Sequence, residues 1–254
     1  MMVTALRLVL IGSVSLFATQ DESSFESFLS EFTKTRSELQ TLRATFTQTT
    51  ITPDEEIVST GTILYTNPKR ILFRYDDPEL HYLVDGLHAY EYDAELQQLQ
   101  IFEMEDRPEV EALFLGFENN TNRLREAYRM RIVPAEPGQK GIILELQPKD
   151  PDSESAFFET LTLHLRERDF LPEFIHIRND AESSVLYAVA DFALNVSLDP
   201  NEARLFLPEG TVIIRNDEYQ ETVGPGGLYL PADPPRTQPN SRTKGGEGAG
   251  EHGP

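Results

Sequence analysis

The chain has 254 residues, no cysteine and a formal net charge of −21 at pH 7. The negative charge disfavours binding to nucleic acid and to anionic lipid headgroups, whose phosphates it repels; a well-solvated surface is its plainest interpretation. The absence of cysteine excludes a disulfide framework and a lipid-modified N-terminal cysteine.

Residues 1–18 have the layout of a secretory signal peptide. The first seven residues carry one positive charge, Leu8–Phe17 is a short apolar run, and small or polar residues follow from Ala18. This run is too short to cross a bilayer, so we expect cleavage near Ala18 and a soluble mature protein. An uncleaved hydrophobic anchor is the alternative.

The segment Phe25–Leu42 predicts an amphipathic helix. Its apolar residues recur at helical spacing, at Phe25, Phe28, Leu29, Phe32, Leu39 and Leu42. Ser23 or Ser24 can cap the start of this helix. Packing onto a sheet is the simplest explanation of such a stripe.

From Arg43 onward the period changes to two, which predicts a long run of strands. The expected strands after the first are Ile57–Tyr65, Arg70–Tyr75, Leu80–Val84, Leu87–Tyr92, Gln97–Met104, Tyr128–Val133, Gly141–Gln147, Leu161–Arg166, Glu173–Arg178, Val185–Leu194, Leu205–Leu207 and Thr211–Ile214. A second helix is expected at Glu109–Phe117. One curved antiparallel sheet with helices over one face satisfies this order best.

The domain predicted from this pattern covers residues 19–216. A disordered polar tail is expected over residues 217–254. Beyond Gly224 the chain consists mostly of Pro, Gly, Ser and charged residues, which cannot offset the entropy of ordering.

Aromatic residues alternate along two predicted hairpins joined at the turn Asp85-Gly86, a strong hairpin signal. They either pack in a core or line a cavity. Strand parity favours a shared apolar cavity lined by Phe46, Ile71, Phe73, Leu83, Tyr90 and Tyr92. No grouping of a nucleophile with a base is visible, and the five histidines lack a shared metal spacing. The pattern therefore indicates binding, with no catalytic residue, no metal and no cofactor.

Several motifs, taken in order, resemble the periplasmic outer-membrane lipoprotein carriers, the LolA-like proteins. They are Leu42-Arg43-Ala44-Thr45-Phe46-Thr47-Gln48, then Gly61, Pro68-Lys69-Arg70-Ile71-Leu72-Phe73-Arg74-Tyr75, Val84-Asp85-Gly86, Tyr90-Glu91-Tyr92-Asp93 and Phe206-Leu207-Pro208-Glu209-Gly210-Thr211-Val212. In this resemblance Ile71 and Phe73 match the pair after the family's proline, and Tyr90 matches its tryptophan after the turn.

The resemblance implies an α+β fold, an incomplete antiparallel β-barrel with helices covering its concave face. It implies a monomeric periplasmic carrier that holds lipoprotein acyl chains, takes them from an inner-membrane lipoprotein-releasing ABC transporter and hands them to an outer-membrane receptor. Leu113 and Phe114 would lie on the lid helix.

One position departs from the family pattern. Where carriers place a lid-binding arginine before the proline, this chain has Asn67. A lipid-binding or sensor module of the same fold, with another lipid or a protein partner, is therefore the alternative function; an enzyme is a third class for which the sequence offers no nucleophile–base pair.

Overall fold

The computed structural model describes residues 15–67, 70–103, 122–133, 141–152, 158–199, 201–216 and 218–231. Its helices are α1 (Ser15–Ser37) and α3 (Asn122–Ala127). Its strands are β1 (Thr41–Ile51), β2 (Glu56–Thr66), β3 (Arg70–Tyr75), β4 (Leu80–Val84), β5 (His88–Asp93), β6 (Gln98–Glu103), β7 (Tyr128–Val133), β8 (Ile142–Pro148), β9 (Thr160–Leu165), β10 (Pro172–Arg178), β11 (Ser184–Leu194), β12 (Leu205–Leu207), β13 (Val212–Arg215), β14 (Glu218–Thr222) and β15 (Leu228–Leu230). The protein is thus mostly β-sheet with few helices.

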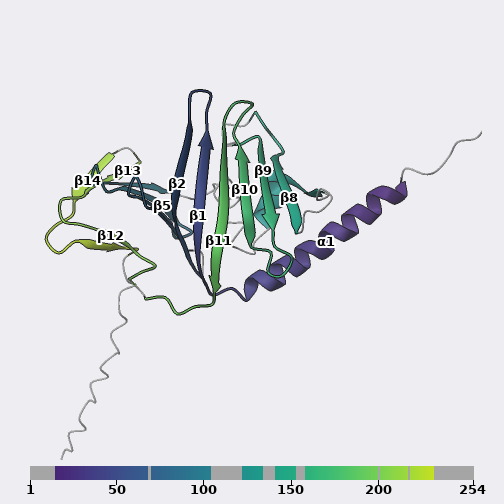
Figure 1. The fold of residues 1–254 in the computed structure, drawn as a ribbon, viewed down its shortest axis with the longest axis horizontal. Helices are drawn as coiled ribbons and strands as arrows, with labels where there is room; N and C mark the ends of the chain where they lie inside the picture. The colour runs from purple at the N-terminus through teal and green to yellow at the C-terminus, as the bar shows by residue number, and fades with distance from the viewer. Residues whose placement is uncertain are drawn as a thin grey trace, which may run out of the picture.

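Thirteen of the described strands form one curved, unclosed sheet (Figure 1), in the order β14-β13-β6-β5-β4-β3-β2-β1-β11-β10-β9-β8-β7. Neighbouring strands are antiparallel, except that β13 pairs with β6 in parallel. The long-range pair β1–β11 joins the meander β2–β6 to the meander β7–β11. The predicted curved, mainly antiparallel sheet is confirmed.

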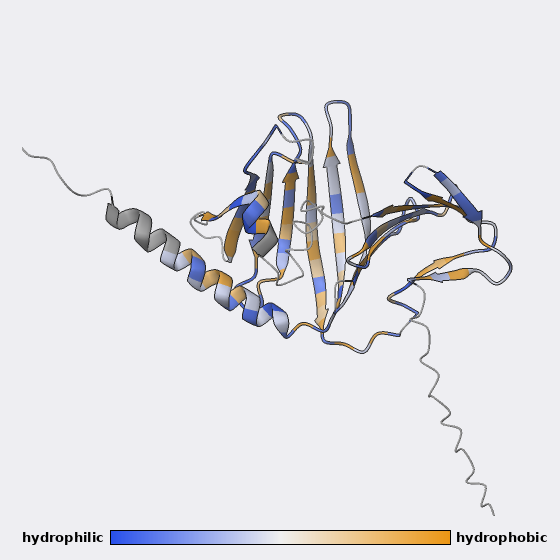
Figure 2. Cartoon of the chain, turned by 180° about the vertical axis from the view of Figure 1, so that it is seen from behind, coloured by the Kyte–Doolittle hydropathy of each residue, from blue (hydrophilic) through white to orange (hydrophobic). Residues whose placement is uncertain are grey.

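Helix α1 lies across the β7–β10 end of the sheet, with apolar residues among its polar ones (Figure 2). The ring of Phe28 meets Phe170 edge-on at 5.6 Å, and Phe32 is fully buried. The helix ends at Ser37 rather than at the predicted Leu42, because Leu42 already belongs to β1, where threonines favour a pleated strand. Neither helix in the described ranges has the length and apolar content needed to cross a membrane.

The two faces of the sheet carry separate hydrophobic cores. The face on which α1 packs, here called the inner face, contains the larger core, which includes Phe32, Leu42, Ile63 and Leu144. On the opposite, outer face, a smaller core covers only the strands β2–β6 and β13. Each core therefore uses its own set of alternating strand residues.

The smaller core is closed by the C-terminal strands. Leu205 and Leu207 of β12 and Leu228 and Leu230 of β15 pack on it, and β12 pairs with β15. The prediction of disorder from residue 217 is therefore wrong for the described residues up to 231. The average composition of this segment is polar, so it did not indicate the short apolar strand Leu228–Leu230 between Gly227 and Pro231.

The predicted lid helix Glu109–Phe117, with Leu113 and Phe114, lies outside the described residues, as do most residues of the predicted signal peptide. Helix α1 begins at Ser15, within the apolar run of that segment.

Candidate functional site

An aromatic wall occupies the middle of the inner face. We use this name for Phe46 of β1, Phe73 and Tyr75 of β3, Tyr82 of β4 and Tyr187 of β11. The Phe46 ring is central to it, 4.9 Å from the ring of Tyr75, 5.7 Å from that of Phe73 and 6.0 Å from that of Tyr187. Tyr82 extends the wall, 5.6 Å from Tyr75. Phe73, Tyr82 and Tyr187 stay partly exposed, so the wall is not sealed in the core.

Strand register assembles this wall from distant parts of the chain. Phe46 faces Gly61 on one side and Val189 on the other, Tyr75 faces Gly61, and Phe73 faces Tyr82. Directly opposed residues share a face. The wall therefore forms because β1 lies between β2 and β11. The paired residues of β1 and β11 are more than 130 positions apart in the sequence.

Gly61 provides the space for the central ring. A Cβ at this position would lie 2.0 Å from the Arg74 carbonyl oxygen and 2.7 Å from the Phe46 ring. Both distances are shorter than van der Waals contact, so any side chain here would displace the ring or the strand β3. The glycine is thus required by the close approach of β1, β2 and β3.

A polar group bounds one end of the wall. The Tyr75 hydroxyl donates to Gln48 Oε1 and lies 3.4 Å from the Tyr187 hydroxyl. Burial raises the pKa of Tyr75 and of Tyr187. For Tyr82, burial is the larger cause and the Glu91 carboxylate the next, and together they raise the pKa to about 12. At neutral pH all three phenols are protonated, and the wall carries no charge of its own.

The structure separates the six residues predicted to share one cavity. Phe46, Ile71 and Phe73 lie on the inner face, as predicted together. Leu83, Tyr90 and Tyr92 lie in the outer-face core, so the prediction that they join Ile71 is wrong. The reason is a one-residue register difference: Leu83 faces Leu72, whereas Ile71 faces Val84. Shifting register by one residue moves a strand's whole apolar set to the other face.

Tyr90 has a structural role near the predicted turn. Its hydroxyl donates to Asp85 Oδ2, while Asp85 Oδ1 accepts from the backbone N–H of Leu87 and His88. Asp85 thus caps its own turn, as its position before Gly86 indicates. Burial raises the pKa of Tyr90, with the Asp85 carboxylate contributing further.

Asn67 and Arg74, which lie near the position of the family's lid-binding arginine, contact other parts of the chain. Asn67 donates from its backbone N–H to the Gln40 carbonyl at 2.8 Å and from its amide to the Leu39 carbonyl at 3.5 Å. Arg74 points to the outer face, where it donates to the carbonyls of Glu202 and Arg204. Asn67 therefore stabilises the connection between α1 and β1, and Arg74 binds the segment that leads into β12.

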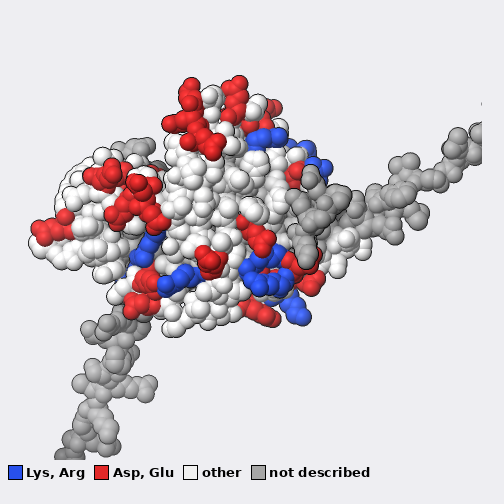
Figure 3. Space-filling model, in the orientation of Figure 1, with Lys and Arg blue, Asp and Glu red and all other residues white. Residues whose placement is uncertain are grey.

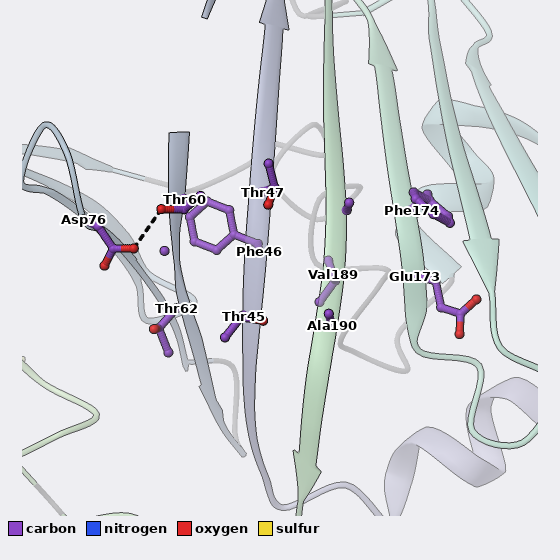
Figure 4. Close-up of a pocket in the computed structure, with 12 residues that line it drawn as sticks. Thr45, Phe46, Thr47, Thr60, Thr62, Asp76, Glu173, Phe174, Val189 and Ala190 are labelled. Carbon is purple, nitrogen blue, oxygen red and sulfur yellow. Dashed lines mark hydrogen bonds between the residues drawn. The ribbon is translucent and has the colours of Figure 1, made fainter. Parts of the chain in front are cut away.

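A groove of about 500 Å³ also opens on the outer face of β1, β2, β10 and β11 (Figure 4). Four threonines and two alanines form half of its lining, which also includes Phe46, Gly61 and the exposed Phe174. Figure 3 shows an uncharged area in the middle of this face, with acidic side chains along its upper edge and side chains of both charges below it. The Thr60 hydroxyl donates to Asp76. The groove is an open surface feature, unlike the aromatic wall.

Sequence reasoning missed Tyr82 and Tyr187. Apolar residues stand two positions before and after each of them, so the face that each shares within its own strand was visible. What could not be read was the register that brings them to Phe46 and Phe73. No group of His, Cys, Asp or Glu suited to a metal occurs among the described residues.

The fold class is thus an open antiparallel sheet with a helix and an aromatic wall on one face. The family model described as "Outer membrane lipoprotein carrier protein LolA" matches residues 37–203, well over half of the chain. The chain belongs to this family.

Solved structures with a related course of the chain are distant in sequence. An uncharacterised conserved protein of Thermus thermophilus shares 11% identity, with a TM-score of 0.49, over 76% of this chain and 99% of that one. A putative outer membrane lipoprotein-sorting protein domain of Vibrio parahaemolyticus shares 13% identity, with a TM-score of 0.43, over 69% and 94%. The MucA/MucB complex of Pseudomonas aeruginosa shares 14% identity, with a TM-score of 0.44, over 72% of this chain and 61% of that one. No curated protein sequence matches.

Proposed function

We propose that this protein is a periplasmic carrier that binds the acyl chains of lipoproteins on the inner face of its sheet and moves them from the inner to the outer membrane. The observation that supports this most is the partly exposed aromatic wall in a member of the lipoprotein carrier family. Its uncharged rings suit a hydrocarbon chain, and carriage requires no chemical step.

The physical basis of carriage is the removal of apolar surface from water. Each methylene buried contributes about 0.8 kcal/mol. A chain lying along the partly exposed Phe73 and Tyr187 gains this stabilisation without a covalent bond, so release to a receptor remains reversible. Specificity for the lipid head would come from other groups.

The partners in this proposal follow from family membership. They are an inner-membrane lipoprotein-releasing ABC transporter as donor and an outer-membrane receptor as acceptor. Cleavage of a signal peptide near Ala18 would place the carrier between them.

The test replaces one wall residue with a carboxylate. In Phe73→Glu the charge would stand where the acyl chain lies, and burying it costs several kcal/mol. We expect the affinity for a fluorescent fatty-acid probe to fall by more than tenfold. The matched control is Leu186→Glu, because Leu186 is 37% exposed on the outer face of the neighbouring half of the sheet.

Equal loss of affinity in both variants, or no binding by the unmodified protein, contradicts the proposal. Mass spectrometry of protein purified from membranes separates the carrier from the alternative lipid-binding module. Lipidated peptide on the protein supports the carrier, and free lipid alone supports the alternative.

A further inference from the structure

Four large apolar side chains are exposed together on the outer face, and we call them the outer patch. They are Ile51 of β1, Val58 of β2, Phe174 of β10 and Leu186 of β11, each between 37% and 58% exposed. Thr49 of β1 faces Val58 on one side and Leu186 on the other. Directly opposed residues share a face, so the patch runs across neighbouring strands.

The outer patch continues into the groove on the same face. Phe174 belongs to both, because it lines the groove and faces Ala188, the groove residue two positions after Leu186. Thr60 of the groove likewise lies two positions after Val58, and residues two apart in a strand share a face. Threonines and alanines leave room for a second molecule in the groove, whose volume is about 500 Å³. Exposed apolar surface with a polar border is typical of a protein-binding site.

Carboxylates border this surface. Asp76 and Glu173 stand on either side of the groove (Figure 4). The turn between β1 and β2 carries Asp54–Glu56, and the turn between β10 and β11 carries Glu182. Both turns lie at one end of the sheet, because β1 pairs with β11 up to Ile51. Figure 3 shows acidic side chains along this edge.

The arginines next to this surface are already paired with carboxylates. Arg43 pairs with Glu202 beyond one end of the groove, and Arg178 pairs with Glu159 at 3.2 Å on the β9 side. The border of the outer patch therefore keeps a negative charge, in agreement with the net charge of −21 for the whole chain.

We propose that the outer patch and the groove together form a docking surface for a basic amphipathic segment of a partner protein. Apolar side chains of that segment would cover Phe174 and Leu186, and its Lys or Arg side chains would face the bordering carboxylates. A second copy of this chain would bring the same negative charge, and an anionic membrane would be repelled as well. The inference goes beyond the proposed function, because a partner on the outer face leaves the aromatic wall free.

The experiment titrates a fluorescein-labelled amphipathic helical peptide of leucine and lysine with the full-length protein. One matched peptide has glutamate in place of lysine, and another has serine in place of leucine. We expect the leucine–lysine peptide to bind about tenfold more tightly than either, because only this peptide matches both the apolar surface and its charge. Its affinity should fall with added salt, which screens exposed charges.

Phe174→Ser and Leu186→Ser should each lower the affinity for the leucine–lysine peptide about tenfold. Both side chains are exposed, so the two variants should keep the fold. The matched control is Phe206→Ser, because Phe206 of β12 is 43% exposed, like Phe174, and lies outside the outer patch and the groove. This control should bind the peptide as the unmodified protein does. Equal affinity of Phe174→Ser and Phe206→Ser, or of the lysine and glutamate peptides, overturns the inference.

The remaining outcomes identify other occupants. Dimers at sedimentation equilibrium that are lost in Phe174→Ser would assign the surface to a second copy, and binding to phosphatidylglycerol vesicles that is lost in the same variant would assign it to a membrane. Displacement of the peptide by the fatty-acid probe would place the peptide on the aromatic wall. Each of these three results overturns the inference. Failure of the fatty-acid probe to bind contradicts the proposed function alone, since the peptide assay does not involve the inner face.

Discussion

Leu83 and Phe73 lie on opposite faces of adjacent strands, so truncating each one separates stability from binding. Leu83 is fully buried in the outer-face core, whereas Phe73 is a partly exposed member of the aromatic wall. Leu83→Ala should lower the free energy of unfolding by about 2–5 kcal/mol, the range for a buried leucine. Probe affinity should not change, because Leu83 does not reach the inner face.

Phe73→Ala should behave in the opposite way. Its ring is incompletely buried, so the loss of stability should be smaller than the 3–5 kcal/mol of a core phenylalanine, about 2 kcal/mol. The acyl probe loses a contact surface, and its affinity should fall about tenfold. Urea titration measures the first quantity and probe titration the second, under the same buffer conditions.

The result that would refute this reasoning is a loss of probe affinity in Leu83→Ala while Phe73→Ala binds normally. That outcome would place the ligand on the outer face, under the C-terminal strands. A change in the urea m-value would instead show that the truncation alters the compactness of the native or unfolded state.

Two further predictions concern other positions. Gly61→Ala should destabilise the protein by about 3 kcal/mol or more, because its Cβ meets the Arg74 carbonyl oxygen at 2.0 Å; a normal urea midpoint would contradict this. Asp85→Ala should cost about 1–3 kcal/mol in thermal or urea unfolding with no effect on the acyl probe, because two backbone N–H groups and the Tyr90 hydroxyl lose their acceptor.

The sequence was sufficient for strand positions but not for strand register. The predicted bounds of β3, β4 and β7 agree with the structure, since alternation and turn residues mark them locally. The face shared by two strands depends instead on the connection between them. The turn between Tyr75 and Leu80 aligns Leu72 with Leu83, and this placed half of the predicted site on the wrong face.

Non-local features were equally hidden. Arg36 lies in the last turn of α1, two residues after the exposed Lys34. It is 3% exposed, and nothing in the neighbouring sequence indicates this burial. The parallel pairing of β13 with β6 and the strand around Tyr229 depend on contacts over more than a hundred and about twenty residues, respectively. Family resemblance supplied the overall fold, but it did not supply these contacts.

The outer-face core also determines where the protein can be shortened. The family match ends at residue 203, whereas Leu205, Leu207, Leu228 and Leu230 cover Leu72 and Leu83. A chain ended at the family boundary would present apolar side chains on both faces of β3 and β4, a surface prone to self-association. We therefore expect that a shortened chain for expression or fusion must extend through residue 231 to keep the outer-face core covered.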